Sequence, residues 1–281
     1  QFLRHGVTRF NQLRRNERHA KEALKQLTPE TLPIYTILVP MYKESRAVMQ
    51  RLITNLNALD YPREKLDIKL VCEADDTETI ATLKALQPPP TMHIVAVPKG
   101  HPRTKPKACN VALQHARGEF LVIYDAEDKP APDQLKRAVL AFTQADPKTA
   151  CLQAGLNYYN RDENLLTQLF AIEYSALFNL LLPALERLHI PIPLGGTSNH
   201  LRVSALRAIG GWDAFNVTED ADLGMRLSYF GYETSLLPSL TLEESPIRLL
   251  PWLRQRTRWI KGYIHTWLVY MRDPHELRSE E

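Results

Sequence analysis

Residues 120–133 read FLVIYDAEDKPAPD, and this stretch indicates most clearly how the chain folds. Residues 120–124 are apolar and rich in β-forming side chains, which predicts a buried strand. Three carboxylates follow the strand: Asp125, Glu127 and Asp128. Carboxylates this close repel one another unless they are solvated, hydrogen-bonded or neutralised by a cation. Because hard oxygen ligands suit Mg²⁺ or Mn²⁺, the stretch predicts either a metal site that holds a diphosphate or an acidic turn.

Length and composition set the frame for that prediction. The chain has 281 residues, of which 44% are hydrophobic and 24% charged, so it can bury a large core in one elaborated domain or two. The net charge of +3 is too small to indicate a nucleic-acid partner. Cys72, Cys109 and Cys151 lie far apart, which predicts neither a zinc site nor a disulfide framework. No signal peptide or bilayer-spanning apolar run is evident, and membrane segments are expected outside these residues.

Residues 1–31 are predicted to form a basic helical extension. Seven arginines and lysines lie there among leucines and alanines, the pattern of an amphipathic helix. Such a helix is expected to lie on the folded domain or on an anionic membrane surface, and a plain solvated helix is the alternative.

Predicted strands and helices alternate along the part of the chain that follows. This alternation predicts an α/β fold with a mostly parallel central sheet flanked by helices. Ligands of such sheets bind outside the carboxyl ends of the strands. The strands are expected at residues 35–39, 67–72, 93–97, 120–124, 150–153 and 233–235, and the helices at 45–59, 77–86, 110–116, 134–142, 164–188, 202–209, 223–230 and 249–270.

The loops after these strands carry candidate ligand-binding side chains. Tyr42 and Glu44 follow the first strand, where they could stack on and hydrogen-bond a base. Asp75 and Asp76 follow the second strand, and a lysine-rich loop before the fourth contains Lys105. Carboxylates suit a metal and a base or ribose edge, whereas lysines meet phosphates as point charges. These loops therefore predict a nucleoside diphosphate site, although no G-x-G-x-x-G or P-loop motif is present.

Five motifs in order resemble glycosyltransferase family 2, most closely its cellulose-synthase-like, membrane-embedded, processive branch. Each string is weak alone, but their ordered occurrence across residues 33–262 is a strong signal. The resemblance implies a GT-A fold that binds a UDP-sugar through Mn²⁺ or Mg²⁺, with a helical extension on the acceptor side. The motifs are VPMYKES (39–45), TKPKACN (104–110), YDAEDKPAPDQL (124–135), TED (218–220) and QRTRW (255–259).

The resemblance also implies which residues bind the donor. Asp125 matches the first carboxylate of the D-x-D metal motif. The second ligand is either Glu127, which stands where the motif has aspartate, or Asp128 beside it. The nucleotide and diphosphate are expected to contact Pro40, Tyr42, Glu44, Asp75 or Asp76, Lys105, Asp125, Gln255, Arg256 and Arg258.

In the T-E-D motif the resemblance makes Asp220 the general base, with Thr218 and Glu219 beside it. The base would deprotonate the acceptor hydroxyl as it attacks the anomeric carbon, and one displacement inverts an α-linked donor into a β-glycoside. A carboxylate with an unshifted pKa is ionised at neutral pH, as this role requires. The same residues also fit a helix N-cap, which is the competing structural interpretation.

Three further regions are assigned to the acceptor side by the resemblance. A glycine-rich loop at residues 193–199 contains Gly196 and Thr197, and Trp259 offers an indole face to a pyranose. The helix at residues 164–188 is interpreted as a core helix of the acceptor half, in preference to an interfacial membrane helix. Residues 249–281 are predicted to lead towards membrane helices that this chain lacks.

The expected protein is a catalytic domain, residues 32–248, of a multi-pass polysaccharide synthase at the cytoplasmic face of the bacterial inner membrane. Its expected partners are a UDP-sugar, a glycan acceptor and the membrane helices of the full-length protein. Two alternatives stay open. One is a non-processive family 2 transferase acting on a lipid or protein, and the other is a degenerate, non-catalytic surface-assembly or receptor module.

Overall fold

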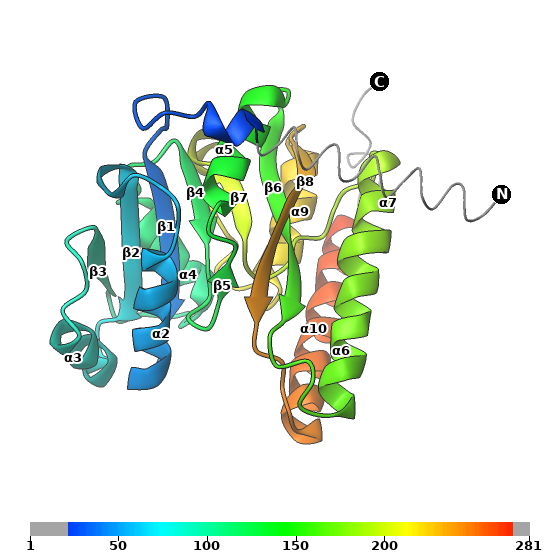
Figure 1. Ribbon diagram of the computed structural model, residues 1–281. Helices are drawn as coiled ribbons and strands as arrows, with labels where there is room; N and C mark the ends of the chain where they lie inside the picture. The colour runs from blue at the N-terminus through cyan, green and yellow to red at the C-terminus, as the bar shows by residue number, and fades with distance from the viewer. Residues whose placement is uncertain (1–21, 272–281) are drawn as a thin grey trace.

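The computed structural model describes residues 22–271, which form one eight-stranded sheet with helices on both faces (Figure 1). The predicted basic extension falls mostly on residues 1–21 and the predicted tail on residues 272–281, and both stretches lie outside the described residues. The strands in spatial order are β3 (Met92–Val97), β2 (Leu66–Glu73), β1 (Tyr35–Met41), β4 (Phe120–Ile123), β7 (Asn199–Arg202), β6 (Thr149–Tyr158), β8 (Glu233–Glu243) and β5 (Lys129–Pro130).

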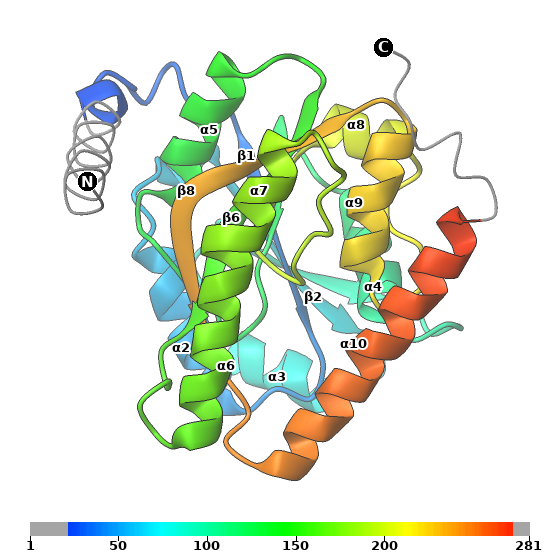
Figure 2. The same cartoon turned by 90° about the vertical axis from the view of Figure 1, so that its right-hand side faces the viewer.

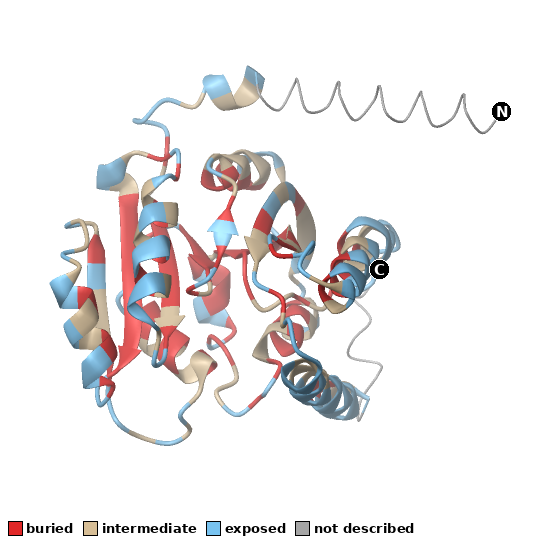
Figure 3. Cartoon of the chain, turned by 60° about the horizontal axis from the view of Figure 1, so that its bottom comes forward, coloured by how far each residue is buried: buried red, intermediate tan, exposed pale blue. Residues whose placement is uncertain are grey.

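The first half of the sheet confirms the prediction of parallel α/β units. β1 pairs in parallel with both β2 and β4, and β2 pairs in parallel with β3. The residues of β2 and β4 are buried throughout, as expected for strands covered on both faces (Figure 3). The helices that follow are α2 (Arg46–Asn57), α3 (Thr77–Ala85), α4 (Lys105–Leu113) and α5 (Gln134–Gln144).

Two hydrophobic clusters cover the two faces of this half. One packs α2, α3 and α5 against the sheet, around the stacked rings of Phe120 and Phe142. The other packs α4, α8 (Val203–Ala208) and α9 (Glu219–Tyr229) against the opposite face, around Trp212. The carboxyl ends of β1, β2 and β4 are left open between these helices, which is where the candidate ligand-binding loops lie.

The second half of the sheet differs from the prediction in its strands. β7 was not predicted, and it pairs antiparallel with both β4 and β6, so the sheet is mixed. Its four residues, NHLR, are too few and too polar to show a strand pattern. β6 and β8 continue beyond their predicted ends, and α4 begins at Lys105 rather than at residue 110. Lys105 therefore stands in the first turn of a helix.

A long helical segment lies on the side of the molecule next to β6 and β8 (Figures 1 and 2). It consists of α6 (Leu165–Ala176), a π-helical turn (Leu177–Leu181) and α7 (Leu182–Arg187). Pro183 stands at the start of α7, directly after the π-helical turn, where its missing N–H costs little. Among residues 22–271, the segment Leu165–Arg187 is the one helix long and apolar enough to cross a membrane by length and composition.

One face of this segment belongs to the core and the other does not. Phe170, Tyr174 and Phe178 are buried in a third hydrophobic cluster with residues of β6, as the core-helix interpretation predicted. Leu165 and Ile172 are exposed on the opposite face. α10 (Leu249–Tyr270), which has the bounds predicted from the sequence, runs beside α9 and completes this side of the molecule (Figure 2).

Candidate active site

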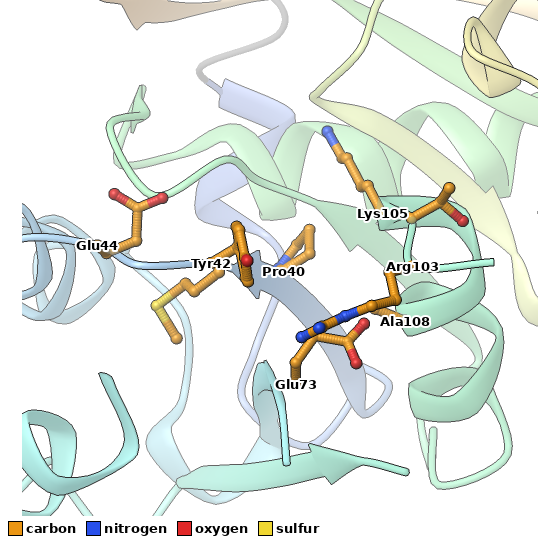
Figure 4. Close-up of a pocket in the computed structure, with 9 residues that line it drawn as sticks. Pro40, Tyr42, Glu44, Glu73, Arg103, Lys105 and Ala108 are labelled. Atoms are coloured by element: carbon orange, nitrogen blue, oxygen red, sulfur yellow. The ribbon is translucent and has the colours of Figure 1, made fainter. Parts of the chain in front are cut away.

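A cavity of ≈ 390 Å³ opens at the carboxyl ends of β1 and β2 (Figure 4). Its size suits a small ligand, and its position is where open α/β sheets bind theirs. Four of the predicted donor-binding residues, Pro40, Tyr42, Glu44 and Lys105, line this cavity. The lining residues are Pro40, Met41, Tyr42, Glu44, Glu73, Arg103, Thr104, Lys105 and Ala108.

Tyr42 and Arg103 form the outer wall of this cavity. The Tyr42 side chain is 52% exposed, and the Arg103 guanidinium lies 5.9 Å from the centre of its ring. Arg103 also donates a hydrogen bond of 2.5 Å to the carboxylate of Asp75. Asp75 therefore fixes the arginine that borders the cavity, and Tyr42 presents a ring face on which a planar base could stack.

Asp76 is committed to holding the loop after β1. One of its carboxylate oxygens accepts a hydrogen bond of 2.7 Å from the Lys43 N–H, and the other accepts one of 3.3 Å from the Thr79 N–H at the start of α3. Lys43 has a φ of 54°, a strained conformation that this bond supports. Burial alone would raise the pKa of Asp76, but these hydrogen bonds outweigh it and lower the pKa. Both predicted alternatives are therefore engaged by protein groups, Asp75 by the Arg103 guanidinium and Asp76 by two backbone N–H groups.

Glu73, the last residue of β2, is a candidate functional residue that was not predicted from the sequence. It lines the cavity, is only 7% exposed, and its Oε2 has no hydrogen-bond partner among the described residues. Leaving a buried carboxylate oxygen unpaired is costly, so the site is suited to a ligand that brings an N–H or O–H group. The available signal was an acid directly after the apolar run LVC at the end of β2.

The Lys105 side chain forms hydrogen bonds both to the loop after β4 and to the glycine-rich loop. Its ammonium donates hydrogen bonds of 2.5 Å to Asp125 Oδ1 and 2.7 Å to the Gly196 carbonyl oxygen. Burial would lower the pKa of this lysine, but the charges of Asp125 and Glu219 outweigh burial and raise it. Lys105 is therefore a fixed cation between two acidic segments, well placed to meet a phosphate.

Asp128 and Glu127 lie very differently, although they are adjacent. The Asp128 side chain is 1% exposed, and its Oδ2 accepts hydrogen bonds from the Asp125 N–H, at 2.8 Å, and from the Thr197 hydroxyl. Burial, followed by the negative charge of Asp125, raises the pKa of Asp128 well above its usual value. Glu127 is exposed beside it. Asp128 thus closes the loop from within, while Glu127 faces outward.

The carboxylates of this loop could supply only some of the ligands that a divalent cation needs. No three histidine, cysteine, aspartate or glutamate side chains within residues 22–271 are grouped closely enough to hold a metal ion by themselves. However, Asp128 Oδ1 and Glu243 Oε1 are both buried without a hydrogen-bond partner. Burial and then the charges of Asp128 and Asp125 raise the pKa of Glu243. This excess of negative charge suits a cation that takes its remaining ligands from phosphate and water, as Mg²⁺ usually does.

The T-E-D motif begins α9, with Thr218 at the N-cap position but without a side-chain capping bond. Burial raises the pKa of Asp220, so the expected unshifted value is wrong. Burial and the neighbouring Asp220 raise the pKa of Glu219 to about 7. A Cβ atom added at Gly196 would lie 3.3 Å from Asp220 Oδ2, so the glycine-rich loop reaches the motif. Asp220 and Glu219 are therefore coupled acids at a site that also contains Lys105.

On α10 the structure separates the two arginines of the Q-x-x-R-W motif. Arg256 forms a bidentate ion pair with Glu173 of α6, and its guanidinium lies 4.5 Å from the Phe170 ring centre and 5.0 Å from that of Trp259. The structure thus does not bring Arg256 to the predicted diphosphate position. Burial raises the pKa of Asp220 and the positive charge of Arg258 opposes that rise, so this second arginine lies towards the T-E-D motif.

Of the other two predicted residues of α10, Trp259 lies near the aromatic cluster of α6. The Trp259 ring is 6.0 Å from that of Phe170 and 6.4 Å from that of Tyr174, centre to centre. Gln255 Oε1 is buried and has no hydrogen-bond partner within residues 22–271. A buried acceptor without a partner is suited to a ligand that brings a hydroxyl group.

Comparison with known proteins places this geometry in a family. The model described as "Glycosyltransferase like family 2" matches residues 33–262. The chain is 25% identical to "Probable glycosyltransferase YdaM" of Bacillus subtilis over 99% of this chain and 66% of that protein. It is 27% identical to "Cellulose synthase 2" of Novacetimonas hansenii over 83% of this chain and 14% of that protein. The chain thus spans less than two thirds of the length of these relatives.

A solved structure has the same fold. The mannosyltransferase PcManGT from Pyrobaculum calidifontis, in complex with GDP-Man and Mn²⁺, superposes with a TM-score of 0.68 at 24% identity, over 91% of this chain and 70% of that one. The α/β architecture is therefore that of GT-A glycosyltransferases. With the family model matching most of its length, the chain belongs to glycosyltransferase family 2.

Proposed function

We propose that the chain is the catalytic domain of an inverting, metal-dependent transferase that moves a hexosyl or N-acetylhexosaminyl group from a UDP-sugar to a growing β-linked polysaccharide. The observation that carries the proposal is the position of Lys105. It contacts Asp125 and the Gly196 carbonyl, and the Gly196 backbone lies against Asp220. The candidate metal-binding carboxylate and the candidate base therefore stand on either side of one lysine and one loop.

Asp220 is the base in this proposal. It takes the proton of the acceptor hydroxyl while that oxygen forms a bond to the anomeric carbon and the bond to the diphosphate breaks on the opposite side. The nucleoside diphosphate leaves, and the single displacement inverts the configuration. The charges of Lys105 and Arg258 oppose the effect of burial on the pKa of Asp220 and so favour its ionised form.

Asp125 and Glu127 are the proposed protein ligands of Mn²⁺ or Mg²⁺, and Asp128 is proposed to shape the loop that presents them. A bound ion would supply Lewis-acid neutralisation of the charge on the leaving diphosphate. Asp128 fits its structural role because one of its oxygens already accepts two hydrogen bonds within the protein. The Mn²⁺ in the solved PcManGT structure supports the choice of metal.

The nucleobase is proposed to enter the cavity between Tyr42 and Glu73. Tyr42 offers a ring for stacking, and Glu73 offers a buried acceptor without a partner. Uracil presents one ring N–H at its pairing edge, which a carboxylate can accept. Guanine presents a ring N–H and an amino group there, whereas cytosine presents an amino group beside a ring nitrogen whose lone pair a carboxylate repels. The cavity therefore favours uridine or guanosine diphosphates over cytidine diphosphate.

Calorimetric titration of the chain with UDP and Mn²⁺ tests this site. The substitution Glu73→Gln is expected to weaken UDP binding by about tenfold or more, because a hydrogen bond to a charged group contributes roughly 1.5–3 kcal/mol. CDP is the matched control: it is expected to bind the unsubstituted chain more weakly than UDP, and Glu73→Gln should narrow that difference. GDP, titrated in parallel, decides between the two donor classes. Equal UDP affinity with and without Glu73→Gln would show that the base does not reach Glu73.

The outer faces of α6, α7 and α10 support a proposed position at the cytoplasmic face of the inner membrane. They expose many apolar side chains, and α10 adds exposed basic residues, the combination found in helices at anionic membrane surfaces. Product length, assayed on the full-length protein, distinguishes a processive synthase from a single-addition transferase. The exposed apolar residues include Leu165, Leu169, Ile172, Leu180, Leu181, Leu249, Leu250, Leu253, Ile260, Ile264, Trp267 and Leu268, and the basic ones Arg254 and Lys261.

A further inference from the structure

Gly262 stands near the middle of α10 although alanine is a better helix former at such a position. It is buried, and a Cβ atom added there would lie 2.3 Å from Thr218 Cγ2, 2.4 Å from Thr218 Oγ1 and 2.8 Å from Thr218 Cβ. Atoms do not approach this closely without a bond, so any side chain at Gly262 would force Thr218 or α10 to move. Thr218, the residue that Gly262 contacts, stands two positions before Asp220 in the chain.

The docking continues along α10 in steps of one turn. Thr266 Oγ1 accepts a hydrogen bond of 3.3 Å from the Asn216 side chain, and Asn216 Oδ1 accepts one of 3.0 Å from the Thr218 N–H. One turn further on, the Tyr270 hydroxyl donates to Asp222 Oδ1 at 3.1 Å. α10 thus holds the chain both before and after the residue that this account assigns as the base (Figure 2).

The same helix carries the Q-x-x-R-W motif. Gln255 and Trp259 precede Gly262 by seven and three residues, spacings that place all three on one side of a helix. A displacement of α10 at Gly262 would therefore shift the T-E-D segment relative to the motif that borders it. The two motifs are coupled through one close approach that only glycine permits.

We propose that Gly262 is a positioning residue that sets the place of Asp220 relative to α10, by letting the helix backbone pack directly on Thr218. The inference rests on the proposed function in taking Asp220 as the base. The effect on Asp220 begins with a steric clash, because a side chain at Gly262 would displace Thr218. The Thr218 carbonyl accepts the Asp222 N–H at 3.1 Å in the first turn of α9, so a shift of Thr218 moves that turn and Asp220 with it.

The test is Gly262→Ala in the full-length protein. Turnover at saturating donor is expected to fall by about 10–10²-fold, because a misplacement of about 1 Å can cost that much. UDP binding in the presence of Mn²⁺ is expected to stay within threefold, because neither Gly262 nor Thr218 lines the cavity at β1 and β2. Gly100→Ala is the matched control: a Cβ there would meet only Lys107 Nζ, at 3.5 Å, and turnover should be preserved. Unchanged turnover in Gly262→Ala would overturn the proposal.

A double-mutant cycle with Thr218→Gly separates this contact from a general loss of structure. Without the Thr218 side chain the added methyl group has room, so Gly262→Ala should change turnover at most threefold in the Thr218→Gly background. Equal losses in both backgrounds would overturn the proposal.

Thermal unfolding of the same four proteins tests the contact even where no sugar transfer is found. Gly262→Ala is expected to lower the Tm in the natural background and to raise it beside Thr218→Gly, since alanine favours the helix. Additive changes in Tm would overturn the steric contact. Absence of UDP binding by the unsubstituted protein would contradict the proposed function instead, which the thermal cycle does not measure.

Discussion

Asp220→Asn is expected to lower sugar transfer by about 10²–10⁴-fold, the range that a general base contributes. Asparagine has nearly the same shape and can still accept the Ala221 N–H bond, which Asp220 Oδ1 accepts at 2.8 Å, so the start of α9 should be preserved. It cannot take a proton from the acceptor hydroxyl. UDP binding with Mn²⁺ should therefore persist while turnover is lost, and single-turnover transfer from a labelled donor measures the difference.

Glu219→Gln is the matched control for this prediction, because it changes the neighbouring carboxylate in the same motif. Burial raises the pKa of both acids, and the negative charge of Asp220 further raises the pKa of Glu219. Transfer requires ionised Asp220, so the rate should fall as the pH drops through the pKa of that residue. Glu219→Gln leaves the Asp220 carboxylate in place, so turnover should fall far less than in Asp220→Asn and the acid limb of kcat/KM should remain. Normal turnover in Asp220→Asn would show that another group is the base.

Asp125→Ala is expected to weaken the Mn²⁺-dependent binding of UDP by about 10²-fold or more, because so few protein carboxylates are available to such an ion. In the unsubstituted chain, EDTA should produce a comparable loss. In Asp125→Ala the affinities measured with Mn²⁺ and with EDTA should be nearly equal. Calorimetric titration of the four combinations measures the effect.

Substitutions of the two neighbouring acids then identify the second ligand. Glu127→Gln should weaken Mn²⁺-dependent binding, since its exposed carboxylate is free to reach an ion. Asp128→Asn should lower the Tm instead, because the Asp128 carboxylate holds the Asp125 N–H and the Thr197 hydroxyl within the loop. A reversed pattern, with binding lost only in Asp128→Asn, would make Asp128 the ligand.

The parts of the fold that could be predicted from the sequence are those with a strong local pattern. The apolar runs that form β1, β2 and β4 are long enough, and bounded clearly enough, to define the parallel half of the sheet. α10 was predicted with the bounds it has, from its amphipathic pattern. β7 escaped because it becomes a strand through pairing with β4 and β6, which lie far from it in the chain.

The candidate site shows the same division. The alternation of strands and loops correctly predicted that Tyr42, Glu44 and Lys105 meet at one cavity, since strand ends in a parallel sheet meet at one edge. Individual side-chain roles could not be predicted in this way. Arg256 is drawn to Glu173, 83 residues away, by a contact that no local pattern encodes. Asp128 and Glu127 are neighbours whose burial differs only because Thr197 arrives from another segment.

Sugar transfer by the full-length protein in membranes tests directly whether the reaction is inverting, needs a metal ion and uses Asp220 as its base. The protein is supplied with α-linked UDP-glucose, UDP-N-acetylglucosamine or GDP-mannose, each isotopically labelled, in the presence of Mn²⁺ or of EDTA. The anomeric configuration of the product is read by NMR. The account predicts a β-linked product from one of these donors, formed with Mn²⁺ and lost with EDTA and in Asp220→Asn. An α-linked product, or transfer that persists in EDTA and in Asp220→Asn, would contradict it.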